Sequence, residues 1–136
     1  MRRSRKMVLA GIAGAVLAGG GLAAWAARQE AMRERRSWAS TLTGGRPELA
    51  EAHILRYGCA ACHDIPGIDG PAGLVGPPLA DIGKRIYIAG VIANTPSNMV
   101  NWIVDPPAVD PMTAMPVTGI SEAEARDVAA YLYSLP

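Results

Sequence analysis

Both cysteines of this 136-residue chain and one of its two histidines stand within five residues, in the segment Cys59-Ala60-Ala61-Cys62-His63. Thiols three residues apart lie on one side of a helical turn, so both can react with a single flat group. The imidazole of the next residue then lies over the face of that group. This segment constrains the fold more than any other feature, because the chain must wrap around whatever the three side chains hold.

The pattern is the covalent attachment sequence of a c-type haem, in which His63 binds the iron. A redox dithiol, a lone disulfide and half of a zinc site are the alternatives. A structural zinc site takes four ligands, and His53 is the only other Cys or His in the chain. A thioredoxin-like dithiol would need a strand before it and a sheet around it. We therefore predict one haem c, covalently attached through Cys59 and Cys62.

The formal net charge of +1 hides two parts of opposite sign. Residues 1–36 carry eight basic and two acidic groups, a net charge of +6, whereas residues 37–136 carry five basic and ten acidic groups, a net charge of −5. A nucleic-acid-binding domain would carry its positive charge on the folded body, which argues against that class. Two cysteines also cannot build a disulfide-dense scaffold. The length allows one ordinary domain and an appendage.

The appendage contains a run of 21 residues without a charge, from Met7 to Ala27, between basic flanks. As a helix it would be roughly 31 Å long, about the thickness of the hydrocarbon core of a bilayer. A signal peptide cleaved near Ala24-Trp25-Ala26 is the alternative, but the run is longer than a usual signal-peptide core of about 7–15 residues. We expect a transmembrane signal-anchor helix over 7–27 that follows a cytoplasmic basic N-terminus over 1–6.

Residues 28–46 are expected to form a charged juxtamembrane helix and then a flexible linker rich in Ser, Thr and Gly over 37–45. Small residues also recur at every fourth position of the anchor, which would let a second helix approach closely in lipid. Chance in an Ala/Gly-rich helix explains this stripe equally well: Gly11, Ala15, Gly19, Ala23 and Ala27.

The body, residues 47–136, is predicted to be all-α, with three to four short helices and long loops. Pro47 suits the first position of a helix that ends at Gly58. Thr95 can cap a second helix that Pro106 must end, and a capping box starts a third over about 122–135. Between Gly58 and Pro96, glycine and proline are too frequent for long regular elements, and no strand pair is expected. Such a fold has a thin core, to which a bound prosthetic group would add apolar bulk.

Residues 46–136 resemble a class I (small, monohaem) c-type cytochrome, especially the bacterial kind found beside respiratory oxidases. Four segments match that family in order: Tyr57–His63, Val75-Gly76-Pro77-Pro78-Leu79, Asn101-Trp102-Ile103-Val104-Asp105-Pro106 and Thr113-Ala114-Met115-Pro116. The family often has a glycine where the first helix crosses the last one. This sequence departs from that pattern, because the corresponding positions read Ala50-Glu51-Ala52.

The resemblance implies a role for several further residues. The Pro77 carbonyl would accept a hydrogen bond from the second ring nitrogen of His63 and so fix its tautomer. Met115 would be the sixth iron ligand, and a thioether opposite a histidine favours the reduced iron. Met112 lies in the same loop and is the alternative, while Met99 is expected on a helix face. Trp102 would lie beside the haem.

Arg85 and Tyr87 follow the Pro77 loop, where the resemblance places groups near the haem propionates. An ordinary solvated surface is the alternative for both. His53 precedes Cys59 by six residues and is expected to be a surface or packing residue.

An iron with both axial positions filled has no place for a substrate, so we expect an electron carrier and not an enzyme. Because haem is attached only after export, the body would face the periplasm of a bacterial inner membrane. Its partners would be a terminal haem–copper oxidase, a quinol–cytochrome c oxidoreductase or a dehydrogenase, with no small-molecule substrate. The alternatives are a fixed subunit of a larger respiratory complex and a haem enzyme such as a peroxidase.

Overall fold

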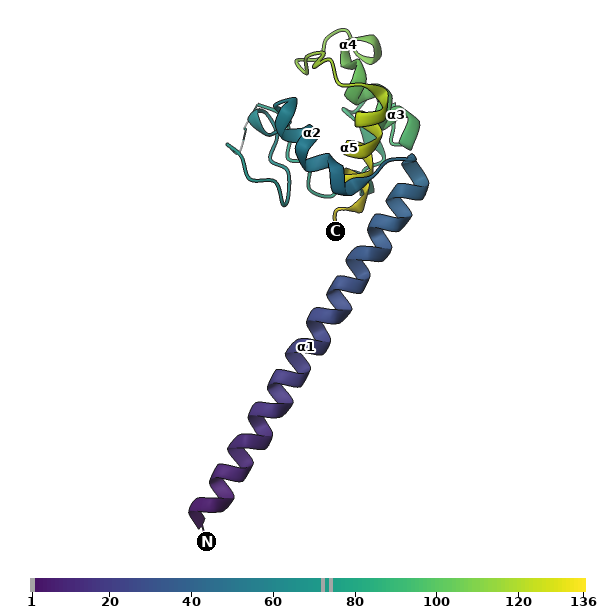
Figure 1. The fold of residues 1–136 in the computed structure, drawn as a ribbon. Helices are drawn as coiled ribbons and strands as arrows, with labels where there is room; N and C mark the ends of the chain where they lie inside the picture. Colours follow the sequence, from purple (N-terminus) through teal and green to yellow (C-terminus); the bar gives the residue numbers. More distant parts are fainter. Residues whose placement is uncertain (1, 72, 74) are drawn as a thin grey trace. The chain divides into compact units, whose positions relative to one another are not determined.

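A computed structural model describes residues 2–71, 73 and 75–136, and it describes the side chains of these residues from position 19 onward. The chain divides between Glu34 and Arg35 into two compact units. Helix α1 (Arg2–Thr43) forms the first unit and continues into the second. The remaining elements all belong to the second unit, the body (Figure 1).

The first unit consists of the N-terminal part of α1, where Leu22 and Trp25 are 68% and 63% exposed. Within the described residues, no helix combines the length and the apolar character that crossing a membrane requires. Most of the transmembrane span predicted over 7–27 falls on residues 7–18, whose side chains lie outside the described part of the chain.

The last turns of α1, residues 35–43, belong to the body, although the sequence predicted a flexible linker over 37–45. That prediction is wrong for residues 37–43 because two of their side chains turn inward. Ala39 is fully buried in the core, and Thr43 is only 5% exposed. The Thr43 hydroxyl donates to the Ala39 carbonyl (2.8 Å) and accepts from the Gly45 N–H (3.1 Å), which holds the helix end.

The three helices predicted in the body are confirmed. The first begins at Pro47 as a short 3-10 turn, continues as an α-helix and is followed by Gly58 with φ 71°. The Thr95 side chain caps the second, and the reciprocal capping box of Ser121 and Glu124 starts the third. These elements are η1 (Pro47–Leu49), α2 (Ala50–Arg56), α3 (Pro96–Val104) and α5 (Glu122–Ser134).

A short helix and a pair of short strands were not predicted. Helix α4 (Pro106–Val109) follows α3, because Pro106 ends α3 and also suits the first position of a new helix that Asp105 caps. Strands β1 (Tyr87–Ile88) and β2 (Ile92–Ala93) form an antiparallel pair, so the expectation of no strand pair is wrong. Their turn has positive φ at Ala89 (52°) and Gly90 (78°). Each strand has only two residues, which is too short for an alternation of polar and apolar side chains to show in the sequence. The rest of the middle is irregular apart from η2 (Cys59–Ala61) and η3 (Ile82–Lys84).

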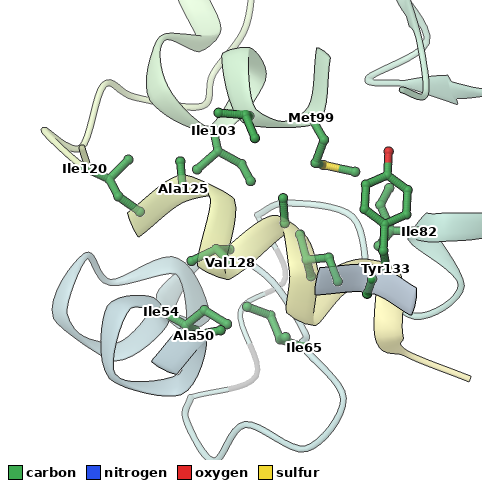
Figure 2. Packing of buried hydrophobic residues seen from close by; sticks show 14 of the residues in the cluster. Ala50, Ile54, Ile65, Ile82, Met99, Ile103, Ile120, Ala125, Val128 and Tyr133 are labelled. Carbon is green, nitrogen blue, oxygen red and sulfur yellow. The ribbon is translucent and has the colours of Figure 1, made fainter. Parts of the chain in front are cut away.

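Helix α5 is the centre of the body core, because α2, α3, η1 and η3 all pack against it. Figure 2 shows Ile54 of α2 below this helix and Ile103 of α3 above it, with Ala125 and Val128 of α5 between them. Ile54 is fully buried and Ile103 is 7% exposed. The same cluster includes Ile65, which anchors the segment just after His63 to the core. The core therefore positions both ends of the Cys59–His63 segment.

The close approach to α5 occurs at Gly45, before α2. A Cβ atom on Gly45 would lie 2.7 Å from the backbone nitrogen of Asp127, so a residue with a side chain would not fit there. Ala50 is also fully buried in the core. The departure at Ala50-Glu51-Ala52 is therefore compatible with tight packing, since a glycine contacts the last helix from another position.

Candidate functional site

The imidazole of His63 lies against the loop that contains Pro77. Its Nδ1 atom is 2.8 Å from the Pro77 carbonyl oxygen, so the contact predicted between these two residues is present. A carbonyl oxygen can only accept a hydrogen bond, which places the proton on Nδ1. The lone pair of the neutral ring is then on Nε2, the atom that remains available to bind a metal.

Two backbone hydrogen bonds hold the Pro77 loop alongside the Cys62–Asp64 segment. The Gly76 N–H donates to the Cys62 carbonyl (2.8 Å), and the Leu79 N–H donates to the Asp64 carbonyl (2.8 Å). A Cβ atom on Gly76 would lie 2.6 Å from Nδ1 and 2.9 Å from Nε2 of His63. Gly76 thus allows the backbone to approach the imidazole face, and any larger residue would displace the ring.

Cys59 is the first residue of the 3-10 turn η2, and Cys62 directly follows that turn. The Cys59 carbonyl accepts from the N–H of both Cys62 (3.2 Å) and His63 (3.0 Å), which keeps the three residues in one compact turn. Neither thiol is in a disulfide, and both are half-buried. Burial raises the pKa of the Cys59 thiol, which keeps it protonated at neutral pH.

Three other predicted residues lie on neighbouring elements. Arg85 is exposed, and its Nη2 atom donates to the carbonyls of Pro78 (2.6 Å) and Ala80 (3.2 Å), just beyond Pro77. Tyr87 is 58% exposed on β1. Trp102 of α3 is partly buried and packs against the core cluster.

Met115 and Met112 lie in the loop between α4 and α5, and the structure separates them by exposure. Met112 is 90% exposed, whereas Met115 is half-buried. The Met115 N–H donates to the Thr113 hydroxyl (3.2 Å), which fixes the backbone at this position. The structure joins Cys59, Cys62, His63 and Pro77 by hydrogen bonds, and Met115 shares none with them among the described residues.

His53 lies away from this group, in a polar cluster between α2 and α5. Its Nε2 atom is 3.3 Å from Asp127 Oδ2, and its Nδ1 atom is 3.6 Å from Glu124 Oε1. Hydrogen bonds from Ser121 and from the Tyr57 hydroxyl lower the pKa of Glu124 to about 2. The structure decides between the surface and packing roles expected for His53, because its half-buried ring joins two helices.

The structure also shows functional residues that the sequence analysis did not single out. Gly76 lies directly before Pro77 in a segment that matches the family, and this position was the signal available for it. Asn94 and Tyr133 support the region around Arg85 through hydrogen bonds, and no local pattern indicated either one. Asn94 and Tyr133 are 39 positions apart, so only the folded chain reveals the bond between them.

The donor set fits an iron porphyrin attached through thioethers. Two free thiols and an imidazole with its Nε2 atom available come from one turn, and a half-buried thioether comes from a separate loop. A thioether and an imidazole are the neutral ligands of low-spin haem iron. Within the described residues, no group of three or more His, Cys, Asp or Glu side chains could hold a metal ion without such a porphyrin.

Comparisons with known proteins agree with this chemistry. A family model described as Cytochrome c matches residues 47–136. Cytochrome c oxidase subunit 2 of Alkalihalophilus pseudofirmus is 35% identical over 78 residues, which are 57% of this chain and 22% of that protein. The protein of the same name from Bacillus sp. (strain PS3) is 34% identical over 86 residues, which are 60% of this chain and 24% of that protein.

Cytochrome c oxidase subunit 2 of Bacillus subtilis is 27% identical over 107 residues, which are 76% of this chain and 30% of that protein. This chain thus spans between 22% and 30% of the length of these relatives. No solved structure matches it at a significant level. Because the family model covers residues 47–136, which are more than half of the chain, the protein belongs to the cytochrome c family, whose domain carries a covalently bound haem c and transfers electrons.

Proposed function

We propose that this protein is a membrane-anchored periplasmic cytochrome c that passes single electrons to a terminal haem–copper oxidase. The observation that carries this proposal is the 2.8 Å hydrogen bond from His63 Nδ1 to the Pro77 carbonyl, which places the ring proton on Nδ1 and leaves the lone pair of Nε2 for iron. Cys59 and Cys62 would hold the haem by thioether bonds. The haem supplies reversible one-electron oxidation of its iron.

The Pro77 carbonyl has a chemical task beyond orientation. By accepting a hydrogen bond from the Nδ1–H group it increases the electron density on the ring and makes His63 a stronger donor at Nε2. Met115 is the proposed ligand on the opposite side, because it is half-buried whereas Met112 is 90% exposed. With both axial positions taken by protein side chains, no position is left for a substrate, which favours electron transfer over catalysis.

Arg85, Tyr87 and Trp102 are proposed to contact the haem periphery. Arg85 already donates through Nη2 to two loop carbonyls, and a guanidinium has five N–H donors in total. The remaining donors can bind a propionate while the loop contact persists. Tyr87 is exposed on β1, close in sequence to Arg85, and Trp102 offers an aromatic surface at the edge of the core.

The proposed anchor is the uncharged run 7–27, preceded by the basic residues 1–6 and followed by a charged helical segment. Its 21 residues would span about 31 Å as a helix, which matches a bilayer core. Haem is attached to cysteines after export, so the body would lie in the periplasm and residues 1–6 in the cytoplasm. A tether of this kind confines the protein to the plane of its partners and raises their effective concentration.

A terminal oxidase is the proposed partner because the three relatives are oxidase subunits by name. The body carries a net charge of −5 over residues 37–136. We therefore expect a neutral or basic docking surface on the partner, and association that slows as the salt concentration rises. A fixed subunit of a larger respiratory complex is the second candidate.

The mass of the mature protein, purified from membranes in mild detergent, tests the haem and the anchor in one measurement. A mass that includes residues 1–136 and one covalent haem supports both, and a mass that lacks the N-terminal residues refutes the anchor. The size of the detergent-extracted particle separates the candidates, since a shuttle leaves the membrane alone and a fixed subunit leaves with its complex.

Substitution of the methionines tests the sixth ligand. Met115→Ala should abolish the far-red methionine–iron absorption band of the oxidised protein, whereas the matched control Met112→Ala should keep it. Loss of the band in Met112→Ala and its retention in Met115→Ala would refute the assignment.

A further inference from the structure

Asn94 occupies a junction between three parts of the body. Its Nδ2 atom donates to the carbonyls of Ile82 (2.7 Å) and Arg85 (2.8 Å). Its Oδ1 atom accepts a 2.6 Å hydrogen bond from the hydroxyl of Tyr133 near the end of α5. Both amide protons and the amide oxygen of Asn94 are thus engaged, and the Arg85 backbone is fixed to the last helix.

The hydrogen bonds from Tyr133 through Asn94 to Arg85 form a connection, and the Arg85 side chain extends it to the Pro77 loop. Its Nη2 atom donates to the carbonyls of Pro78 (2.6 Å) and Ala80 (3.2 Å). Pro77 and Pro78 have no N–H groups, so this part of the loop cannot be fixed by amide donors of its own. Its carbonyls must be held by donors from elsewhere, and Arg85 and His63 provide them.

We infer that Asn94 and Tyr133 are positioning residues for His63. They hold Arg85, Arg85 holds the loop, and the loop presents the Pro77 carbonyl to Nδ1 of the imidazole. The inference depends on the proposed function, in which Nε2 of His63 binds the haem iron. Tyr133 is 8% exposed and belongs to the core cluster, so the far end of this chain of contacts is rigid.

These contacts predict the sign of the change in reduction potential. If the Tyr133 hydroxyl is removed, Asn94 Oδ1 loses its hydrogen-bond donor, the Arg85 backbone loosens and the Pro77 carbonyl moves more freely. The hydrogen bond to Nδ1 then weakens, and His63 becomes a poorer donor to the iron. A poorer donor stabilises the oxidised iron less, so the reduction potential rises.

The test compares Tyr133→Phe with wild type in the full, haem-loaded chain. Tyr133→Phe removes one hydroxyl and keeps the aromatic volume. We expect the Nδ1 proton of His63 to exchange with solvent about two- to tenfold faster, as observed by NMR, and the midpoint potential to rise. Tyr57→Phe is the matched control, because it also removes one hydroxyl bonded to α5 (2.8 Å, to Glu124) and lies outside the connection.

A double-mutant cycle distinguishes an effect of Tyr133 that acts through Asn94 from a general loosening of the fold. If Tyr133 acts through Asn94, the double variant Tyr133→Phe/Asn94→Ala should shift the potential no more than Asn94→Ala alone. Additive shifts, or equal shifts in Tyr133→Phe and Tyr57→Phe, would overturn the inference. If Tyr133→Phe does not accumulate, Asn94→Asp replaces it, since that change removes both amide donors while keeping an acceptor for Tyr133.

The failure of the inference is distinguishable from the failure of the proposed function. Wild-type oxidised protein should show paramagnetically shifted ring protons of His63, and their absence would refute iron binding by His63. If these protons are present and unchanged in rate and position in Tyr133→Phe, only the positioning roles of Asn94 and Tyr133 are refuted.

Discussion

Replacing Gly76 by alanine should displace the imidazole of His63. The added Cβ would lie 2.6 Å from Nδ1, whereas ordinary contact begins at 3.4 Å, so the ring must retreat by about 0.8 Å. Because the added Cβ lies over the ring face, this movement shifts Nδ1 sideways from the Pro77 carbonyl and misaligns the 2.8 Å hydrogen bond between them. The backbone at Gly76 does not have a positive φ, so the effect comes from this contact and not from strain in the alanine.

The expected destabilisation has two parts. Overpacking costs about 1–3 kcal/mol, and loss of the hydrogen bond costs about 1 kcal/mol, which together give about 2–4 kcal/mol. Unfolding of the haem-loaded protein in urea, followed by haem absorbance and by tryptophan fluorescence, measures the free energy. The midpoint potential should rise as well, because His63 donates less electron density without its bond to Pro77.

Gly90→Ala is the matched control. Gly90 has φ 78° and no atom within 4 Å of its added Cβ, so this change strains the turn by about 1–2 kcal/mol without touching His63. The reasoning is refuted if Gly76→Ala leaves the potential and the His63 ring signals unchanged. It is also refuted if both variants shift the potential equally.

The remaining predictions concern stability. The pKa of Glu124 is about 2, chiefly because the Ser121 hydroxyl and amide donate to its carboxylate, against 4.5 for a free side chain. The unfolded chain therefore takes up this proton first, and stability should fall as the pH drops from about 4.5 to 2. Glu124→Gln should remove this part of the acid dependence in urea titrations at several pH values. Asp127→Ala should cost about 1–3 kcal/mol, because it leaves the Arg46 N–H without its 2.7 Å acceptor, and Asp127→Asn should recover part of that loss. Ile54→Ala should cost about 2–5 kcal/mol, since Ile54 is fully buried, and a loss below 1 kcal/mol in thermal unfolding would contradict its place in the core.

The elements that the sequence predicted well depend on neighbours in the chain. The capping box of Ser121 and Glu124 joins residues three positions apart, and Pro47, Thr95 and Gly58 act on the turn in which they stand. The segment Cys59–His63 is likewise local. Hydrogen bonds and φ values of this range are encoded by a few consecutive residues, so the helices of the body and the haem attachment segment were readable.

The predictions that were wrong concern residues 37–43 and the strand pair β1 and β2. Residues 37–43 looked like a linker because Ser and Thr favour irregular structure in isolation, but burial of Ala39 and Thr43 makes the helix the better state. Strands β1 and β2 are too short to show a period of two. Their pairing depends on a turn with positive φ at Ala89, a residue that rarely adopts it.

The sequence by itself determined that two thiols and an imidazole are presented by one turn, next to a proline loop that suits a haem. The tertiary structure decided how that imidazole is held. Gly76 approaches the ring, Gly45 approaches the backbone of α5, and Tyr133 contacts Asn94 from 39 positions away. These contacts depend on which side chains fit between segments that only folding brings together, and shape complementarity over such separations leaves no periodic signal in the chain.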